Sequence, residues 1–339
     1  MTPTTIKPNN IFQRAEIGKV RTAQEDSHDM AFTPNGDVFV VCDGMGGYVG
    51  GAEASSTAVK SIIEFLNKEK YDNIPQALKE ALQFANIQIL GKVNENPALK
   101  GMGTTACILL LQKGKAYIAH VGDSRIYLYL SKEKKLRRIT KDHSYVQTLV
   151  DLPDGHPDKI SDDEAEKHPS KNRILKALGI KPKLEPTVSE KPILSKNGNV
   201  FLICSDGLSG MLPDSTIEGV LTNKSSLKEK GDLLVELALE AGGLDNITLQ
   251  MIQVADSQYK KNDYKHCDFT PKSKGKSKNK SSAYKSKKLK KFIKWTIAVI
   301  ILLVLGIGLY LCIKEDQKAT KRAEEELDHK FPKYSMEEK

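Results

Sequence analysis

The chain has 339 residues, of which 39% are hydrophobic and 28% charged, and its formal net charge is +9. This composition suffices for a buried core in one large domain or two ordinary ones. The positive charge is local, because residues 256–294 contain 14 Lys and Arg against 3 Asp and Glu, whereas residues 1–255 contain 31 against 32. The balanced segment gives no ground for a nucleic-acid-binding face, and we expect no nucleic-acid partner.

Short apolar runs rich in β-branched residues predict buried strands. They lie at 37–42, 104–111, 115–121, 125–130, 199–204 and 246–254. Apolar residues at helical spacing predict one helix that begins near Ala52, and others at 75–93, 214–222 and 226–241. The strands come in clusters separated by helix pairs, which favours an α+β domain over residues 1–255, with antiparallel sheets and helices packed outside them.

The C-terminal part has a different composition. Residues 256–294, rich in Lys and Ser, predict a flexible linker. Residues 295–313 contain no charged residue, and as a helix about 28 Å long they predict a transmembrane span, with a buried core helix as the alternative. The linker lysines outnumber the basic residues of the tail, 314–339, so we expect a single-pass membrane protein with residues 1–294 in the cytoplasm and the tail outside.

Several acidic residues stand where predicted strands begin or end. Asp43 follows "VFVVC", Asp206 follows "VFLICS", Asp123 follows "AYIAHVG", Asp245 precedes "NITLQMIQV", and Glu25 and Asp26 adjoin in "RTAQEDS". Buried carboxylates are costly unless a cation offsets their desolvation. A ligand set of oxygens alone favours hard ions, Mg²⁺ or Mn²⁺. Each acid taken singly is also compatible with a turn or helix cap.

Two neighbouring features refine this interpretation. Arg21 lies four residues before Glu25 and is a candidate clamp for an oxyanion. The glycine-rich stretch "GMGGYVGG" after Asp43 departs from G-x-G-x-x-G, because Val49 stands at the last position, and it has no P-loop lysine. These departures argue against a nucleotide-binding loop.

Eight ordered motifs then become recognisable: "RTAQED", "VCDGMGG", "GTT", "AHVGDSRIY", "DHS", "EAEKHPSKNRILKALG", "FLICSDGLSGML" and "GGLDNIT". They resemble the motifs of the bacterial branch of the metal-dependent PP2C-type (PPM) protein serine/threonine phosphatases, over about residues 11–255. The resemblance implies a four-layer α-β-β-α sandwich with a metal centre at one end. It also implies hydrolysis of phosphoserine and phosphothreonine in proteins by a hydroxide that bridges two metal ions.

The same resemblance implies roles for individual residues. Asp43 resembles the carboxylate that bridges two Mn²⁺ or Mg²⁺ ions. Glu25 and the carbonyl of Gly44 would complete the shell of one ion, and Asp206 and Asp245 that of the other.

Three further residues resemble members of the family's site. Asp26 resembles the acid that orients metal-bound water, and Asp123 resembles a ligand that joins Asp206 at a third, weaker ion site. Arg21 would bind the substrate phosphate, so Arg21 and Asp43 are the expected catalytic residues.

The sequence departs from the family at two places. Met45 and Tyr48 stand where different members have a histidine, so we expect metal-bound water to protonate the leaving oxygen. His28, His120 and His143 are alternatives by motif proximity, although structural roles are more common for such residues. Residues 142–179 resemble the family's mobile flap, with a longer segment at 152–159.

The leading hypothesis is a membrane-anchored cytoplasmic phosphatase that acts on phosphorylated proteins and opposes a Ser/Thr kinase. A catalytically silent, membrane-tethered scaffold that binds phosphoproteins is the alternative from a different class. The chain retains the full set of acidic site residues, which argues against a catalytically silent scaffold. A relative dedicated to anti-sigma antagonist proteins would share the chemistry and differ in substrate.

Overall fold

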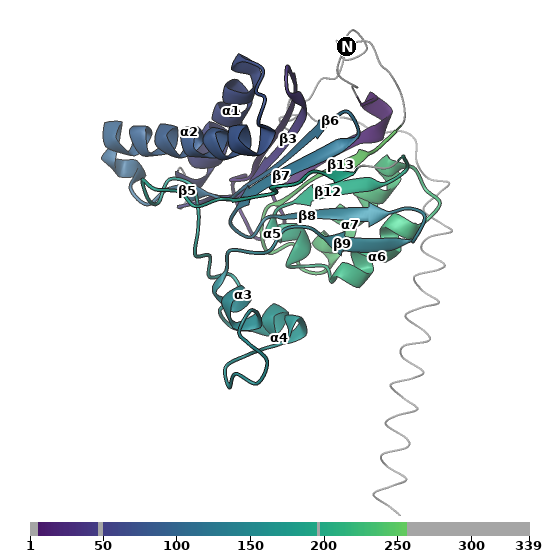
Figure 1. Ribbon diagram of the computed structural model, residues 1–339. Helices are drawn as coiled ribbons and strands as arrows, with labels where there is room; N and C mark the ends of the chain where they lie inside the picture. Colours follow the sequence, from purple (N-terminus) through teal and green to yellow (C-terminus); the bar gives the residue numbers. More distant parts are fainter. Residues whose placement is uncertain (1–5, 47–49, 195–196, 256–339) are drawn as a thin grey trace, which may run out of the picture. The chain divides into compact units, whose positions relative to one another are not determined.

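Two antiparallel β-sheets stack face to face in the computed structural model (Figure 1). The first has the strand order β1 (Ile11–Glu16), β13 (Ile247–Gln253), β12 (Val200–Cys204), β8 (Arg125–Leu130), β9 (Lys135–Arg138). The second has the order β10 (Thr187–Val188), β7 (Lys115–Val121), β6 (Ala106–Gln112), β3 (Gly36–Cys42), β2 (Ser27–Thr33), and β11 (Ile193–Leu194) also pairs with β7. A small third sheet pairs β4 (Gly44–Met45) with β5 (Gly103–Thr104).

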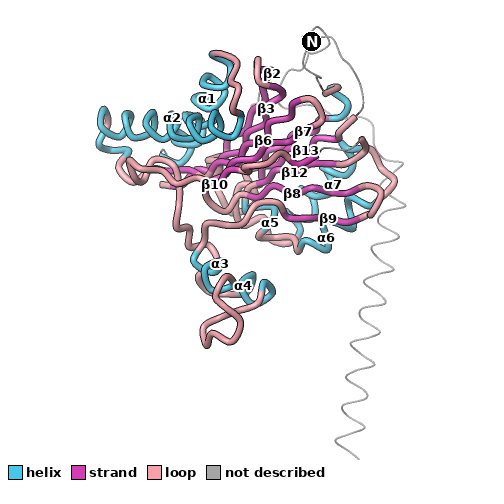
Figure 2. The backbone as a smooth tube through the Cα atoms, viewed as in Figure 1, coloured by secondary structure: helices cyan, strands magenta, loops and turns pink. Residues whose placement is uncertain are grey.

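Helices cover the outer face of each large sheet (Figure 2). The second sheet carries α1 (Gly50–Lys68) and α2 (Ile74–Glu95), and the first carries α5 (Asp206–Ser209), α6 (Asp214–Thr222) and α7 (Leu227–Glu240). Two short helices, α3 (Tyr145–Val150) and α4 (Asp162–Lys167), lie in the predicted flap, and 3₁₀ turns occur at Pro8–Asn10 and Pro97–Leu99. The order of layers is therefore helix, sheet, sheet, helix, as expected.

The central strands read as continuous apolar runs because both of their faces are buried. In β3, Phe39 and Val41 join the core between the two sheets, whereas Val38 and Val40 pack beneath α1 and α2. In β12, Phe201 likewise faces the core between the sheets, and the neighbouring side chains face α5 to α7. Three apolar layers thus hold the four layers of secondary structure together.

Most predicted elements are confirmed, and the strands 115–121 and 125–130 and the helix 214–222 coincide with β7, β8 and α6. The predicted strand 104–111 is divided into β5 and β6, because Thr105 leaves the ladder to bond Asp43. Strands β1, β2, β4, β9, β10 and β11 and helices α3, α4 and α5 were not predicted. Of these, β1, β2 and β9 lie at sheet edges and are only partly buried, so their apolar pattern is weak.

The structure describes residues 6–46, 50–194 and 197–255. All of them lie in one compact unit, Met1–Asp268, and the second unit, Phe269–Lys339, is outside the described residues. Tyr48, the predicted linker 256–294, the predicted span 295–313 and the tail 314–339 are therefore also outside them. Among the helices that are described, none has the length and apolar character that crossing a membrane requires.

Candidate metal centre

Strand β3 ends at Cys42 and places Asp43 at the end of the sandwich. The backbone N–H of Asp43 donates to Thr105 Oγ1 at 2.9 Å, and its carbonyl accepts from Thr105 N–H and Thr104 Oγ1, both at 2.8 Å. These bonds satisfy the backbone of Asp43 where it leaves the sheet. Its carboxyl group is left to face the other acids.

Three segments meet closely beside Asp43. A Cβ atom on Gly44 would lie 2.1 Å from the carbonyl oxygen of Gly51 and 2.5 Å from that of Glu25. A Cβ atom on Gly51 would lie 2.8 Å from Glu25 Oε1. The Glu25 carbonyl also accepts from Ser55 Oγ at 2.6 Å, which ties this loop to α1. The glycines after Asp43 therefore permit a close packing of Glu25, Gly44 and the start of α1.

This packing makes Gly44→Ala a sharp test. The methyl group would overlap backbone atoms that cannot rotate away, so we expect the free energy of unfolding to fall by about 3 kcal/mol. Gly91→Ala is the matched control, because a Cβ atom there meets nothing within 4 Å and the residue lies inside α2. The control should be neutral or stabilising by up to about 1 kcal/mol. Equal urea midpoints for the two variants would contradict the packing argument.

Four carboxyl groups from different elements converge at this end of the sandwich. Those of Asp43 and Asp206 lie close enough to interact directly. Burial raises the pKa of Asp43 well above its ordinary value, and the charges of Asp26, Asp206 and Asp123 raise it further. Burial also raises the pKa of Asp26 to about 8 and that of Asp123 to about 8. The group is electrostatically unfavourable without a cation.

Three buried oxygens of these acids lack any hydrogen-bond donor: Glu25 Oε1, Asp123 Oδ1 and Asp206 Oδ1. Buried polar atoms are ordinarily paired, so acceptors left unpaired among repelling carboxyl groups fit a divalent cation. As they stand, no three or more His, Cys, Asp or Glu side chains of the described ranges are grouped closely enough to hold an ion. The donor set therefore has the chemistry that a divalent cation requires.

Arg21 forms ion pairs with two of the predicted site acids. Its Nη2 donates to Asp245 Oδ2 at 2.7 Å, and its Nη1 lies 3.8 Å from Glu25 Oε2. The guanidinium is half exposed and lies between two of the predicted ligands. The structure thus brings together all the predicted site residues that it describes: Arg21, Glu25, Asp26, Asp43, Gly44, Asp123, Asp206 and Asp245.

Asn246 is a residue of the site that the sequence did not single out. Its buried amide accepts from Glu25 N–H at 2.7 Å and donates to the carbonyls of Ile17 and Ala23, each at 2.9 Å. One side chain therefore fastens the loop that carries Arg21 and Glu25 to the loop that carries Asp245. Its only sequence signal is its place directly after Asp245, which a turn residue would share.

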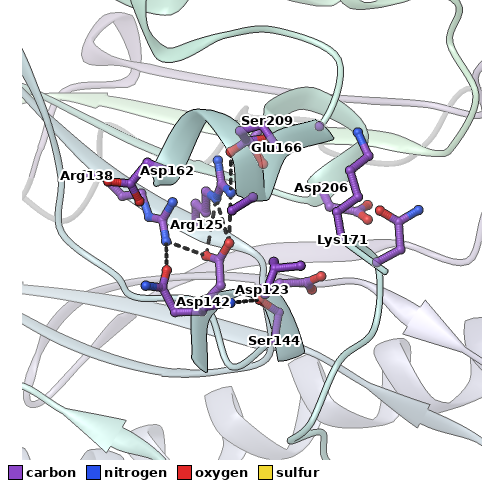
Figure 3. Close-up of a pocket in the computed structure, with 15 residues that line it drawn as sticks. Asp123, Arg125, Arg138, Asp142, Ser144, Asp162, Glu166, Lys171, Asp206 and Ser209 are labelled. Carbon is purple, nitrogen blue, oxygen red and sulfur yellow. Dashed lines mark hydrogen bonds and ion pairs between the residues drawn. The ribbon is translucent and has the colours of Figure 1, made fainter. Parts of the chain in front are cut away.

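A pocket opens beside Asp123 and Asp206, and the predicted flap forms one side of it (Figure 3). Arg125 of β8 donates from Nη2 to Asp142 Oδ2 at 2.8 Å and to Glu166 Oε1 of α4 at 3.0 Å. Sequence reasoning gave no role to Arg125, because its partners are distant in the chain. These contacts dock the flap next to Asp123.

The three candidate histidines have structural partners. His143 Nδ1 accepts from Gly122 N–H at 3.2 Å, and its Nε2 pairs with Thr187 Oγ1 at 2.8 Å. Burial and the neighbouring His120, whose ring stacks at 4.6 Å, lower the pKa of His143 to about 4. His120 Nε2 pairs with the Lys141 carbonyl, and His28 Nδ1 with Gln13 Oε1. Each ring is therefore engaged in holding the fold.

The raised carboxyl pKa values predict an unusual pH dependence for metal-free protein. Asp26 and Asp123 have folded pKa values of about 8, above the ordinary 3.8, so the folded state binds protons more tightly than the unfolded state. The melting temperature in chelator should therefore rise as the pH falls from about 9 to about 5. Asp123→Asn should show a shallower slope than the unmodified chain. A variant slope equal to that of the unmodified chain would contradict the assigned pKa.

Comparison with known proteins places these observations in a family. The family Protein phosphatase 2C matches residues 19–239. The serine/threonine phosphatase stp of Listeria welshimeri is 34% identical over 245 residues, which cover 71% of this chain and 94% of the relative. The protein phosphatase PhpP of Streptococcus pneumoniae is 31% identical over 242 residues, covering 70% and 95%.

Solved structures agree with the sequence relatives. Stp1 from Staphylococcus aureus superposes with a TM-score of 0.67 at 30% identity, over 75% of this chain and 97% of that one. The catalytic domain of the phosphatase PstP, solved in complex with two manganese ions, has a TM-score of 0.62 at 33% identity, over 73% and 98%. The chain therefore belongs to the protein phosphatase 2C family, and it is a metal-dependent protein serine/threonine phosphatase of the bacterial type.

Proposed function

We propose that the convergent acids hold two Mn²⁺ or Mg²⁺ ions, with Asp43 as the ligand common to both. Glu25 and the Gly44 carbonyl would help to hold one ion, and Asp206 and Asp245 the other, while Asp123 and Asp206 would hold a third ion more weakly. The observation that carries this assignment is the set of buried, unpaired oxygens on Glu25, Asp123 and Asp206. The two manganese ions in the related PstP structure support the proposed number of ions.

The bound ions would activate a water molecule as the nucleophile and offset the negative charge of the phosphate. The remaining steps belong to the protein's own residues. Arg21, half exposed and held beside the acids by Asp245, binds the phosphate oxygens of the substrate. Asp26, whose Oδ2 accepts from Ser205 Oγ at 2.8 Å, is fixed in position to orient the attacking water molecule.

We further propose that the enzyme acts on phosphoserine and phosphothreonine in proteins near a membrane, where it opposes a Ser/Thr kinase. The uncharged run 295–313 supports a membrane anchor, and the Lys-rich segment 256–294 supports a cytoplasmic catalytic domain. A flexible linker of this length reaches on the order of 30–35 Å. Such a tether raises the effective concentration of membrane-bound substrates.

The test is release of phosphate from a phosphothreonine peptide by the full chain in detergent micelles, with Mn²⁺ added to chelator-treated protein. Metal-dependent turnover is expected. Binding of the phosphopeptide without turnover would favour the catalytically silent scaffold.

Removal of residues 256–339 separates tethering from catalysis. Because the proposed ligands all lie within residues 21–245, kcat/KM for a soluble phosphopeptide should stay within about twofold of the full chain. Turnover of a phosphoprotein anchored to vesicles should fall. A large loss on the soluble peptide would show that the C-terminal segment does more than tether.

A further inference from the structure

Exposed apolar side chains gather beside the proposed phosphate-binding residue. Seven large hydrophobic side chains are exposed in the described part of the chain, and three of them lie in the loops around Arg21 and Asp245. They are Ile17 at 37%, Val20 at 62% and Leu244 at 56% exposure. Exposed apolar residues scattered singly are ordinary, whereas a group at a functional site indicates a binding surface. We call these three residues the apolar rim.

Two contacts hold the rim in place. Lys19 N–H donates to the Gly243 carbonyl at 2.7 Å, and Arg21 Nη2 donates to Asp245 Oδ2 at 2.7 Å. Val20 lies between Lys19 and Arg21 in the chain, and Leu244 lies between Gly243 and Asp245, so both stand between the same two contacts.

Further contacts hold the loop that contains Arg21 against the loop that contains Asp245. A Cβ atom on Gly18 would lie 2.2 Å from the Asp245 carbonyl, so the two backbones touch. Asn246 Nδ2 donates to the Ile17 carbonyl at 2.9 Å. The exposure of Val20 and Leu244 is therefore a property of a fixed surface.

We propose that the apolar rim binds the substrate polypeptide, by receiving an apolar side chain within a few residues of the phosphoserine or phosphothreonine. This inference rests on the proposed role of Arg21 in phosphate binding. A phosphate group that reaches Arg21 brings the adjoining residues of its chain over Val20 and Leu244, which are the neighbours of Arg21 and of its partner Asp245. The occupant is thus the substrate itself.

The rim adds selectivity to a site that otherwise recognises a phosphate group. Arg21 and the acids interact with the phosphate, which every substrate shares, and cannot distinguish one flanking sequence from another. Covering Val20 and Leu244 with an apolar side chain removes apolar surface of both partners from water, whereas a polar side chain gives a smaller gain. The enzyme should therefore prefer phosphoresidues with Leu, Val or Ile nearby over those with Ser or Asn nearby.

The experiment compares the full chain with the double variant Val20→Ser/Leu244→Ser. The substrates are p-nitrophenyl phosphate and two phosphothreonine peptides that differ only in having Leu or Ser at the positions flanking the phosphoresidue. The matched control is Ile87→Ser/Leu194→Ser, which changes two similarly exposed side chains on α2 and β11. Melting temperatures establish that each variant is folded.

The unmodified chain should prefer the Leu-flanked peptide by roughly tenfold in kcat/KM, and the rim variant should lose that preference. Its rate on p-nitrophenyl phosphate and on the Ser-flanked peptide should change by less than about twofold, as should all rates of the control. An undiminished preference in the rim variant, or an equal loss on all three substrates, would overturn the proposal. Failure of the proposed phosphate site is a separate result: Arg21→Ala would then hydrolyse all three substrates as the unmodified chain does.

Discussion

Replacing Asp43 with Asn lowers kcat/KM for a phosphothreonine peptide by roughly 10³-fold or more in the presence of Mn²⁺. The amide is neutral and cannot replace the carboxylate that we propose is shared by two cations. The same change should not destabilise the metal-free protein. Burial and the charges of Asp26, Asp206 and Asp123 raise the pKa of Asp43, so removing its carboxyl group relieves repulsion.

Calorimetry and thermal melting in chelator and in Mn²⁺ test both parts of this prediction. The variant should melt at or above the temperature of the unmodified protein in chelator, and should lose the stabilisation that Mn²⁺ gives. Asp37→Asn is the matched control, since Asp37 is a buried acid of β3, the strand that Asp43 follows, and accepts from the N–H of Ile6 at 3.0 Å. Activity within about tenfold of the unmodified protein in the Asp43 variant would refute the bridging role.

The second large effect is expected for Asn246→Ala. The substitution leaves the buried Glu25 N–H without its acceptor, and the part-buried carbonyls of Ile17 and Ala23 without their donor. We expect the free energy of unfolding to fall by about 2–4 kcal/mol. The loops that carry Arg21, Glu25 and Asp245 would also lose their common attachment, so more Mn²⁺ should be needed for half-maximal activity.

Asn35→Ala separates loss of stability from loss of the site. Asn35 is also fully buried, donates from Nδ2 to the carbonyls of Leu66 and Glu69, and accepts from Tyr71 N–H, all at 2.7 Å. It lies where β2 turns into β3, within a different set of contacts. Replacing Asn35 should lower the free energy of unfolding by a similar amount, without changing the Mn²⁺ concentration needed for half-maximal activity. If both variants need the same Mn²⁺ concentration as the unmodified protein, Asn246 has a purely structural role.

The predictability of the fold depends on where each strand lies. β3 and β12 are buried on both faces, and their unbroken apolar runs identify them without further information. β1 and β2 are edge strands in which polar and apolar residues alternate irregularly, and their pairing with distant strands determines their structure. Local sequence contains little of that long-range information.

The residues of the site also differ in how far the sequence alone could identify them. Asp43, Asp123 and Asp206 could be predicted, because an acid directly after a buried strand needs a compensating partner. The buried pair of Arg125 with Asp142 could not, because it joins residues 17 positions apart whose meeting depends on the β8–β9 hairpin and the turn after it. The ion pair between Arg21 and Asp245 also lies beyond local sequence, since 224 positions separate its members.

The pairing of β1 with β13 has a consequence for how the molecule folds. Glu16 lies opposite Ile247 and Ile11 opposite Ile252, and in the described sheets β1 has no other neighbour. A ribosome must therefore finish almost the whole domain before the first strand can find its partner. Closing so long a loop has a high entropic cost, and sheets with such distant contacts fold slowly. The loops that follow β1 and precede β13 contain Arg21, Glu25 and Asp245, so a nascent chain acquires the proposed catalytic centre only when β1 and β13 have met.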